Sequence, residues 1–110
     1  MSFAKRFIGA ETLPTRLSDF DVQQSFCLSA DDIAAVAERF RHDRRVAAAI
    51  QMLFLRASGR PMDRFASVPK TLLRAVCEAF QTSTVSIASL RTLYARRQTL
   101  YEHQAWARTY

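Results

Sequence analysis

Residues that interrupt regular secondary structure are scarce in this 110-residue chain, which has two glycines and three prolines. Hydrophobic residues make up 49% of the sequence, enough to form a packed core. A chain of this length typically folds around a single core. The composition therefore favours one compact domain over disorder.

The sequence also lacks an apolar run long enough to span a membrane, which takes about 20 residues. The longest run, Val46 to Leu55, contains Gln51 and is flanked by arginine. The first ten residues include a basic pair but not the apolar stretch of a secretory signal. We therefore expect no membrane association and a cytoplasmic location.

Cysteine is rare, and the two cysteines are isolated from each other and from histidine. Cys27 and Cys77 form no Cys-x-x-Cys motif, and neither has a histidine at a ligand spacing. Two buried, reduced thiols are the preferred interpretation, with a disulfide or a reactive cysteine as the alternatives. We expect no metal and no cofactor.

Recognisable catalytic motifs are missing as well. Neither His42 nor His103 lies in a nucleophile motif, and two glycines cannot make a phosphate-binding loop. Asp31 and Asp32 are adjacent, but such neighbours point about 100° apart on a helix, and acids at a helix start favour capping over metal binding. An enzyme is the least favoured class of function.

Acidic residues are scarce in the second half of the chain. The net charge is +6; residues 1–55 hold seven basic and seven acidic residues, whereas 56–110 hold nine and three. This asymmetry indicates an anionic partner for the carboxyl-terminal half, with nucleic acid favoured over a membrane surface. Composition alone is equally compatible with a basic surface that serves only solubility.

Helical periodicity predicts an all-α single domain of five or six short helices, with no alternating strand pattern. Residues 1–17, which contain Gly9 and Pro14, are interpreted as an amino-terminal arm, and residues 18–110 as the helical domain. The arm has no sustained period.

Capping residues mark the expected helix starts. Ser18 and Ser29 each precede acids within three residues, so that the hydroxyl caps an amide and the acid faces the helix dipole. Asp43 is expected to cap the strongest helix, which ends at Gly59. Two further starts are predicted, one at Ser67-Val68-Pro69 with proline in the first turn and one at Ser86.

The last part of the chain has two interpretations. Thr99 and Glu102 match a capping box, which predicts a sixth helix starting there. One continuous helix over 86–109 is the alternative, because the intervening residues are good helix formers. Together with the preceding helices, the first interpretation predicts a helix-turn-helix-like carboxyl-terminal part, whose last helix would enter a DNA groove.

Basic residues cluster in two runs, over 39–45 and 91–103, and the second run interleaves them with aromatic and hydroxyl side chains. Guanidinium groups suit phosphate oxygens and guanine edges. The alternative is a charged helix face with intrahelical pairs, but acids are too few here to neutralise the arginines. The predicted DNA-binding residues are Arg44, Arg45, Arg91, Arg96, Arg97, Thr99, Tyr101 and His103.

The order of these features resembles the amino-terminal domain of Tn-three-type, replicative bacterial transposases. The resemblance covers about residues 13–108 and rests on a collinear series of segments rather than on one diagnostic motif. A departure follows Arg44, where Arg45-Val46-Ala47 partly replaces charged residues. The matching segments are Leu17-Ser18-Asp19, Ser29 to Asp32, Arg41 to Arg44, Ala48 to Arg60, Val68-Pro69 and Ser89 to Gln104.

This resemblance implies a non-catalytic DNA-binding module that recognises the terminal inverted repeats of a transposon in double-stranded DNA. In that family strand transfer belongs to an Asp, Asp, Glu metal site far downstream of this domain, so no enzyme activity is expected here. The alternative is a protein-interaction or regulatory module that pairs transposase subunits by self-association or binds a host factor.

Overall fold

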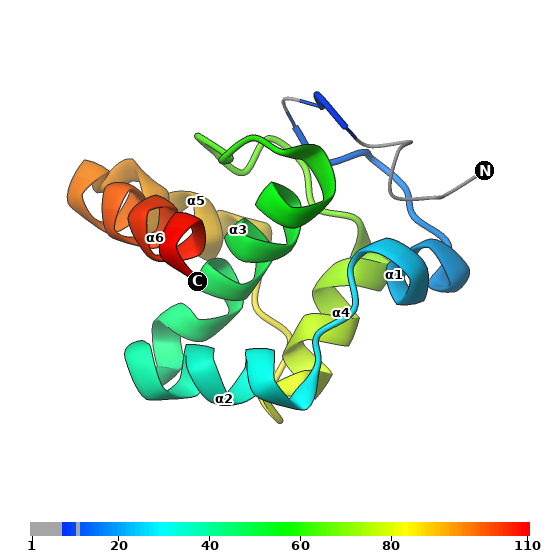
Figure 1. Cartoon of the computed structure of the whole chain (residues 1–110), viewed down its shortest axis with the longest axis horizontal. Coiled ribbons are helices and arrows are strands. Elements are labelled where there is room, and N and C mark those ends of the chain that lie inside the picture. Colours follow the sequence, from blue (N-terminus) through cyan, green and yellow to red (C-terminus); the bar gives the residue numbers. More distant parts are fainter. Residues whose placement is uncertain (1–7, 11) are drawn as a thin grey trace.

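The computed structural model describes residues 8–10 and 12–110, and the regular secondary structure of these residues is helical, with no strand. This confirms the predicted all-α fold. In chain order the elements are α1 (Asp19–Ser25), α2 (Ala30–Arg39), the 3-10 helix η2 (His42–Arg44), α3 (Arg45–Ser58), α4 (Lys70–Ala79), α5 (Ile87–Ala95) and α6 (Arg97–Thr109), as Figure 1 shows.

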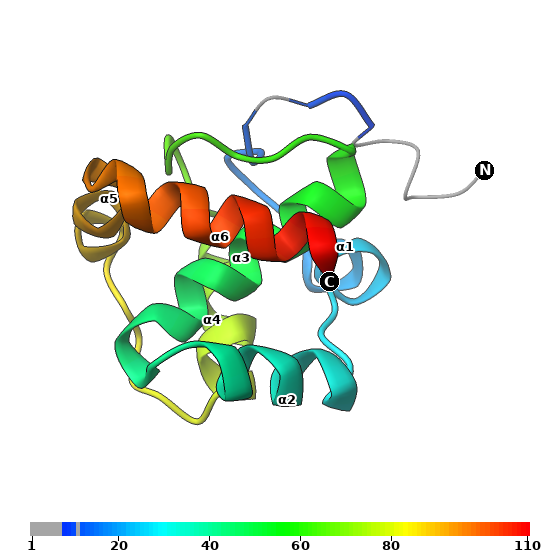
Figure 2. The same ribbon diagram turned by 60° about the vertical axis from the view of Figure 1, so that its left-hand side comes forward.

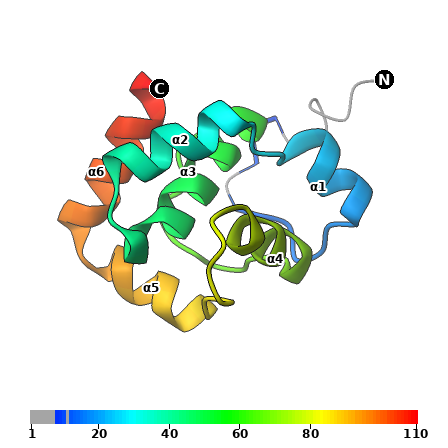
Figure 3. The ribbon, with the colours of Figure 1, turned by 90° about the horizontal axis from the view of Figure 1, so that it is seen from below.

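Helix α3 is the centre of the fold. Of its 14 residues, 11 are buried, because helices pack on several of its sides. α6 lies across it and α2 and α4 contact it elsewhere (Figure 2). Seen from below, α1 and α4 form one end of the molecule and α5 and α6 the other (Figure 3). No helix in the described ranges has the length and apolarity to cross a membrane.

The serine caps are confirmed. The Ser18 hydroxyl accepts a hydrogen bond from the Asp21 amide at 3.1 Å, and the Asp21 carboxylate accepts one from the Ser18 amide, which completes a capping box. Ser29 and Asp32 make the same pair of contacts at α2. Ser86 caps α5 through the Ser89 amide. Local sequence therefore sets these three helix starts.

Two predicted caps are wrong, because tertiary packing overrides the local signal. Asp43 lies within η2, so α3 begins after Arg44 without a side-chain cap. The break before the last helix is confirmed, but it lies at Arg96, and Thr99 is buried inside α6. A single extended residue joins α5 to α6, so the three- to four-residue turn of a helix-turn-helix is not confirmed.

The prediction of two buried thiols is half wrong. Both cysteines are free, and Cys77 is buried, but Cys27 is exposed. The preceding residue, Phe26, ends α1 and turns into the core, which directs Cys27 toward solvent.

The carboxylate of Asp32 joins three helices. Besides capping α2, it pairs with both terminal nitrogens of Arg56 on α3, at 3.0 and 3.1 Å. The Tyr110 hydroxyl, just beyond α6, donates to it at 2.8 Å. Hydrogen bonding to Arg56 is the main reason that the pKa of Asp32 lies well below its usual range, despite the opposing effect of burial.

Gly59 gives the first testable consequence. It ends α3 with φ of +81°, and a Cβ built on it would meet no atom within 4 Å. Gly59→Ala should therefore cost only the strain of the left-handed backbone, about 1 kcal/mol of unfolding free energy measured by urea denaturation. Gly59→Asn is the matched control and should cost less, because asparagine tolerates this conformation. Equal losses would contradict the backbone explanation.

Candidate nucleic-acid interface

Two of the predicted contact residues lie in the core. His103 is fully buried and Thr99 is 4% exposed, so neither can touch DNA while the domain is folded. This corrects their assignment as surface residues. Both project from the face of α6 that packs on α3, as do Leu100 and Ala107.

His103 belongs to a buried polar network. Its Nδ1 lies 3.0 Å from the hydroxyl of Tyr94, which also contacts the Ala47 carbonyl at 3.3 Å. The amide of Gln51 donates to the same hydroxyl at 3.3 Å. Helices α3, α5 and α6 thus meet around one tyrosine oxygen.

The network also holds the loop between α3 and α4. The Gln51 side chain accepts a hydrogen bond from the Met62 amide at 2.6 Å and donates one to the Met62 carbonyl at 2.8 Å. Gln104 donates to the same carbonyl and to the Asp63 carboxylate, both at 3.0 Å. Met62 is 1% exposed, so the loop is fastened at its middle.

Tyr94→Phe tests this network. The change keeps the ring but leaves His103 Nδ1 and the Ala47 carbonyl without their shared partner, so it should cost about 1–3 kcal/mol of unfolding free energy. The matched control is Tyr101→Phe, since Tyr101 lies on α6 and is 54% exposed. Urea denaturation of both variants should separate them, and similar losses would mean that the buried hydroxyl contributes no net stability.

The burial of His103 makes stability depend on pH. Desolvation first, and the charge of Arg44 next, lower the pKa of His103 from its ordinary 6.5 to about 4, so the folded protein keeps the ring neutral. Between pH 6.5 and about 4 the unfolded chain alone binds this proton, and each pH unit should remove up to about 1.4 kcal/mol of unfolding free energy.

Urea denaturation between pH 7 and 5 measures this effect. Because the ordinary pKa of Asp32 is 3.8 and its folded pKa is lower still, that carboxylate loses its contribution at more acidic pH. His103→Asn removes the titrating group and should flatten the profile in this range. If the stability of the variant falls with pH as steeply as that of the parent, the pH dependence comes from another residue.

Two predicted arginines bond backbone carbonyls. Arg45 donates to Phe40 at 3.1 Å and Ala37 at 3.3 Å, where it neutralises the negative end of α2. Arg91 donates to Phe65 at 2.8 Å and Ala66 at 2.6 Å, which fixes the second part of the α3–α4 loop against α5.

The other predicted arginines differ in exposure. Arg44 is half-buried, with its Nε enclosed and without a hydrogen-bond partner. Arg96 and Arg97 are exposed at the start of α6. Arg97 donates to the Tyr101 hydroxyl at 3.4 Å, one turn further along the helix. Arg96, Arg97 and Tyr101 are therefore the predicted residues whose side chains are most available to a ligand.

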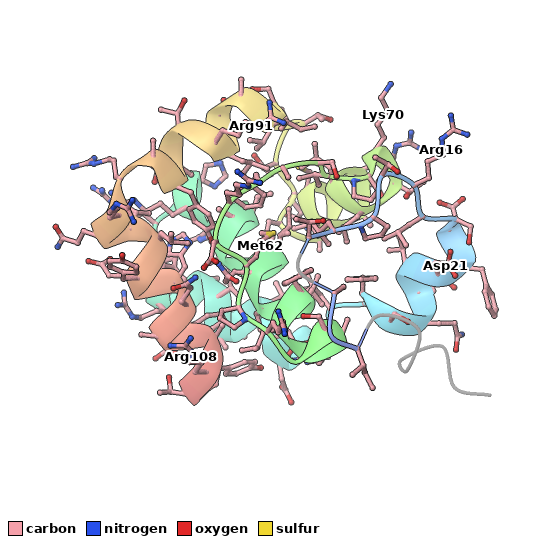
Figure 4. The ribbon with its side chains drawn as sticks, turned by 90° about the horizontal axis from the view of Figure 1, so that it is seen from above. Arg16, Asp21, Met62, Lys70, Arg91 and Arg108 are labelled. Carbon is pink, nitrogen blue, oxygen red and sulfur yellow. The ribbon has the colours of Figure 1, made fainter. Side chains whose placement is uncertain are left out.

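A groove of about 380 Å³ lies between the α3–α4 loop and α5. Its two charged residues are Arg64 and Arg91, and Arg96 and Arg97 directly follow its last residue. Figure 4 shows Arg91 on α5 near the loop that carries Met62. We call this surface the basic groove; its lining residues are Arg64, Phe65, Ala66, Arg91, Tyr94 and Ala95.

Arg64 was missed from sequence because it is an isolated basic residue in a non-helical segment. Gln51 and Gln104 hold the loop at Met62, and Arg91 holds it at Phe65 and Ala66, so Arg64 between them reaches the groove. The one signal that could have identified this position is a basic residue that closely follows the helix-ending Gly-x-Pro segment.

Fold and groove together define a small all-α domain with a basic surface. Residues 10–110 match the model of a family described as "Domain of unknown function (DUF4158)". Because this match covers most of the chain, the chain belongs to the DUF4158 family.

A transposase is among the relatives of this chain. The "Transposase for insertion sequence element IS1071 in transposon Tn5271" of Comamonas testosteroni is 32% identical over 103 residues, which is 94% of this chain. The chain spans 11% of the length of that protein. No solved structure matches the chain significantly. This is therefore a transposase-related domain.

Proposed function

We propose that this domain is a non-catalytic DNA-binding module of a transposase and that it recognises the terminal inverted repeats of a transposon. The observation that carries the proposal is the basic groove with Arg96 and Arg97 beside it. None of the described residues that line the groove is acidic, and the carboxylate of Asp63, which precedes Arg64 in the loop, accepts a hydrogen bond from Gln104.

The exposed side chains of this surface are suited to binding phosphate oxygens. Arg64, Arg96 and Arg97 are exposed, and the planar guanidinium group donates to two phosphate oxygens at once. Such contacts would position the duplex, whereas sequence recognition requires further contacts to base edges. Tyr101, exposed and adjacent to Arg97, adds a hydroxyl and an aromatic ring at the same corner.

His103 and Thr99 have a different role in this proposal. They lie beneath the surface, where His103 contacts the Tyr94 hydroxyl of α5, so they position Arg96 and Arg97 rather than contact DNA. Binding is the whole activity proposed for this domain; strand transfer would belong to another part of the transposase.

Salt dependence of duplex binding tests the proposal. If the domain neutralises about four to six phosphates, the logarithm of its affinity should fall with the logarithm of salt concentration with a slope of roughly −3.5 to −5.5. Fluorescence anisotropy with a labelled terminal-repeat duplex measures the slope. Equal affinity for a scrambled duplex would contradict sequence recognition. A slope near zero would contradict the proposed phosphate contacts.

Arg96→Ala with Arg97→Ala locates the contact. The double variant should weaken binding and reduce the slope by about one to two units, with little change in stability, because both side chains are exposed. Arg39→Ala with Arg41→Ala is the control, with the same loss of charge near the end of α2. Equal effects would indicate diffuse electrostatics instead of a defined surface.

The second candidate function is a protein-interaction module. It is favoured by a pocket of about 150 Å³ between α1 and α4, lined mostly by apolar side chains such as Val22, Phe26, Leu28 and Val76. A domain that self-associates or binds a partner through this pocket, and that shows no salt-dependent affinity for DNA, would fit this alternative.

A further inference from the structure

A second groove, of about 470 Å³, is lined by residues before α1 and by the starts of α4 and α5. Its two charged residues are Arg16 and Lys70, and Figure 4 shows both side chains projecting from the same side of the molecule. We call it the arm groove; its lining residues are Thr15, Arg16, Leu17, Val68, Pro69, Lys70, Thr71 and Ile87.

Hydrogen bonds fix the arm groove. The Thr71 hydroxyl donates to the Leu17 carbonyl at 2.6 Å, and the Ser67 hydroxyl donates to the Leu13 carbonyl at 3.2 Å. Leu13 and Leu17 are themselves buried in the core. Arg16 therefore extends from a segment that is fastened on both sides of it, close to the start of α4.

The two grooves are lined by neighbouring stretches of chain and by the same helix, α5. Residues 64–66 line the first and 68–71, which include the start of α4, line the second. On α5, Ile87 lines the arm groove and Arg91 the basic groove, and residues four apart lie one above the other on a helix. The groove that holds Arg64 and Arg91 and the groove that holds Lys70 and Arg16 therefore border the same stretch of chain and the same helix.

Charge and polarity indicate the class of ligand. No acid is found among the described residues that line either groove, whereas four of them are cationic; the carboxylate of Asp63, beside Arg64, accepts a hydrogen bond from Gln104. The large exposed hydrophobic residues of the described chain are Ile8, Phe20, Tyr101 and Tyr110, and none of them lines a groove. A membrane surface would need such residues for insertion, whereas an anionic polymer needs only the cations.

We infer that the two grooves form one track for the phosphate backbone of duplex DNA, with Arg16 and Lys70 as contacts additional to those near α6. The inference rests on the proposed function and extends it, because it places the DNA along residues 64–71 as well as at the α5–α6 junction. Duplex DNA carries one charge per about 1.7 Å of its axis, so a track of this kind meets several phosphates.

The experiment compares double variants of the 110-residue chain on a labelled mixed-sequence DNA duplex, by anisotropy over about 50 to 200 mM salt. Arg16→Ala with Lys70→Ala should weaken binding and make the salt slope less negative by about one to two units. Arg39→Ala with Arg41→Ala is the matched control, with equal loss of charge outside both grooves, and should change the slope less.

Two further measurements make the outcomes distinct. Circular dichroism checks the fold of each variant, and Lys70→Glu, a single exposed change, repeats the test if the double variant is unstable. A parent chain without salt-dependent DNA binding would overturn the proposed function and this inference together. A parent that binds, with Arg16 and Lys70 variants no different from the control, would overturn the track alone.

Discussion

The fold depends on satisfying one buried amide. Gln51 is fully buried on the central helix, where an unpaired amide group costs about 1–3 kcal/mol. Its side chain meets that requirement with both backbone groups of Met62 and with the Tyr94 hydroxyl. The α3–α4 loop must therefore cross α3 at this point, and α5 must place its tyrosine beside it. Both grooves are bordered by the segment that follows this crossing.

Much of the fold follows from local sequence. The capping boxes of Ser18 and Ser29 and the helix end at Gly59 depend on contacts within three or four residues. They can therefore be predicted without a tertiary structure. The caps expected at Asp43 and Thr99 fail for the opposite reason. Their helices start where burial of Val46 and Leu100 against the core requires, and tertiary burial outweighs a capping interaction of about 1 kcal/mol.

The candidate site was less accessible to sequence analysis. Runs of arginine led to the exposed Arg96 and Arg97, but Arg16, Arg64 and Lys70 are isolated in sequence and come together only through the folded loop. Sequence analysis predicts Thr99 and His103 as surface contacts because Thr99 matches a helix cap and both residues lie in the basic run over 91–103. Their four-residue spacing matches that of Leu100 and Gln104, which is the periodic signal of a buried face. Sequence similarity to a transposase supports the class of protein but does not locate the surface.

The Asp32 carboxylate has a consequence for how this domain can vary. It starts α2, pairs with Arg56 of α3 and receives the Tyr110 hydroxyl, so one side chain meets three geometric requirements at once. Asparagine could preserve the cap but would leave the guanidinium without its counter-charge, and glutamate would move the charge away from the helix start. A replacement of Asp32 therefore affects the start of α2 and the contacts of Arg56 and Tyr110 at the same time.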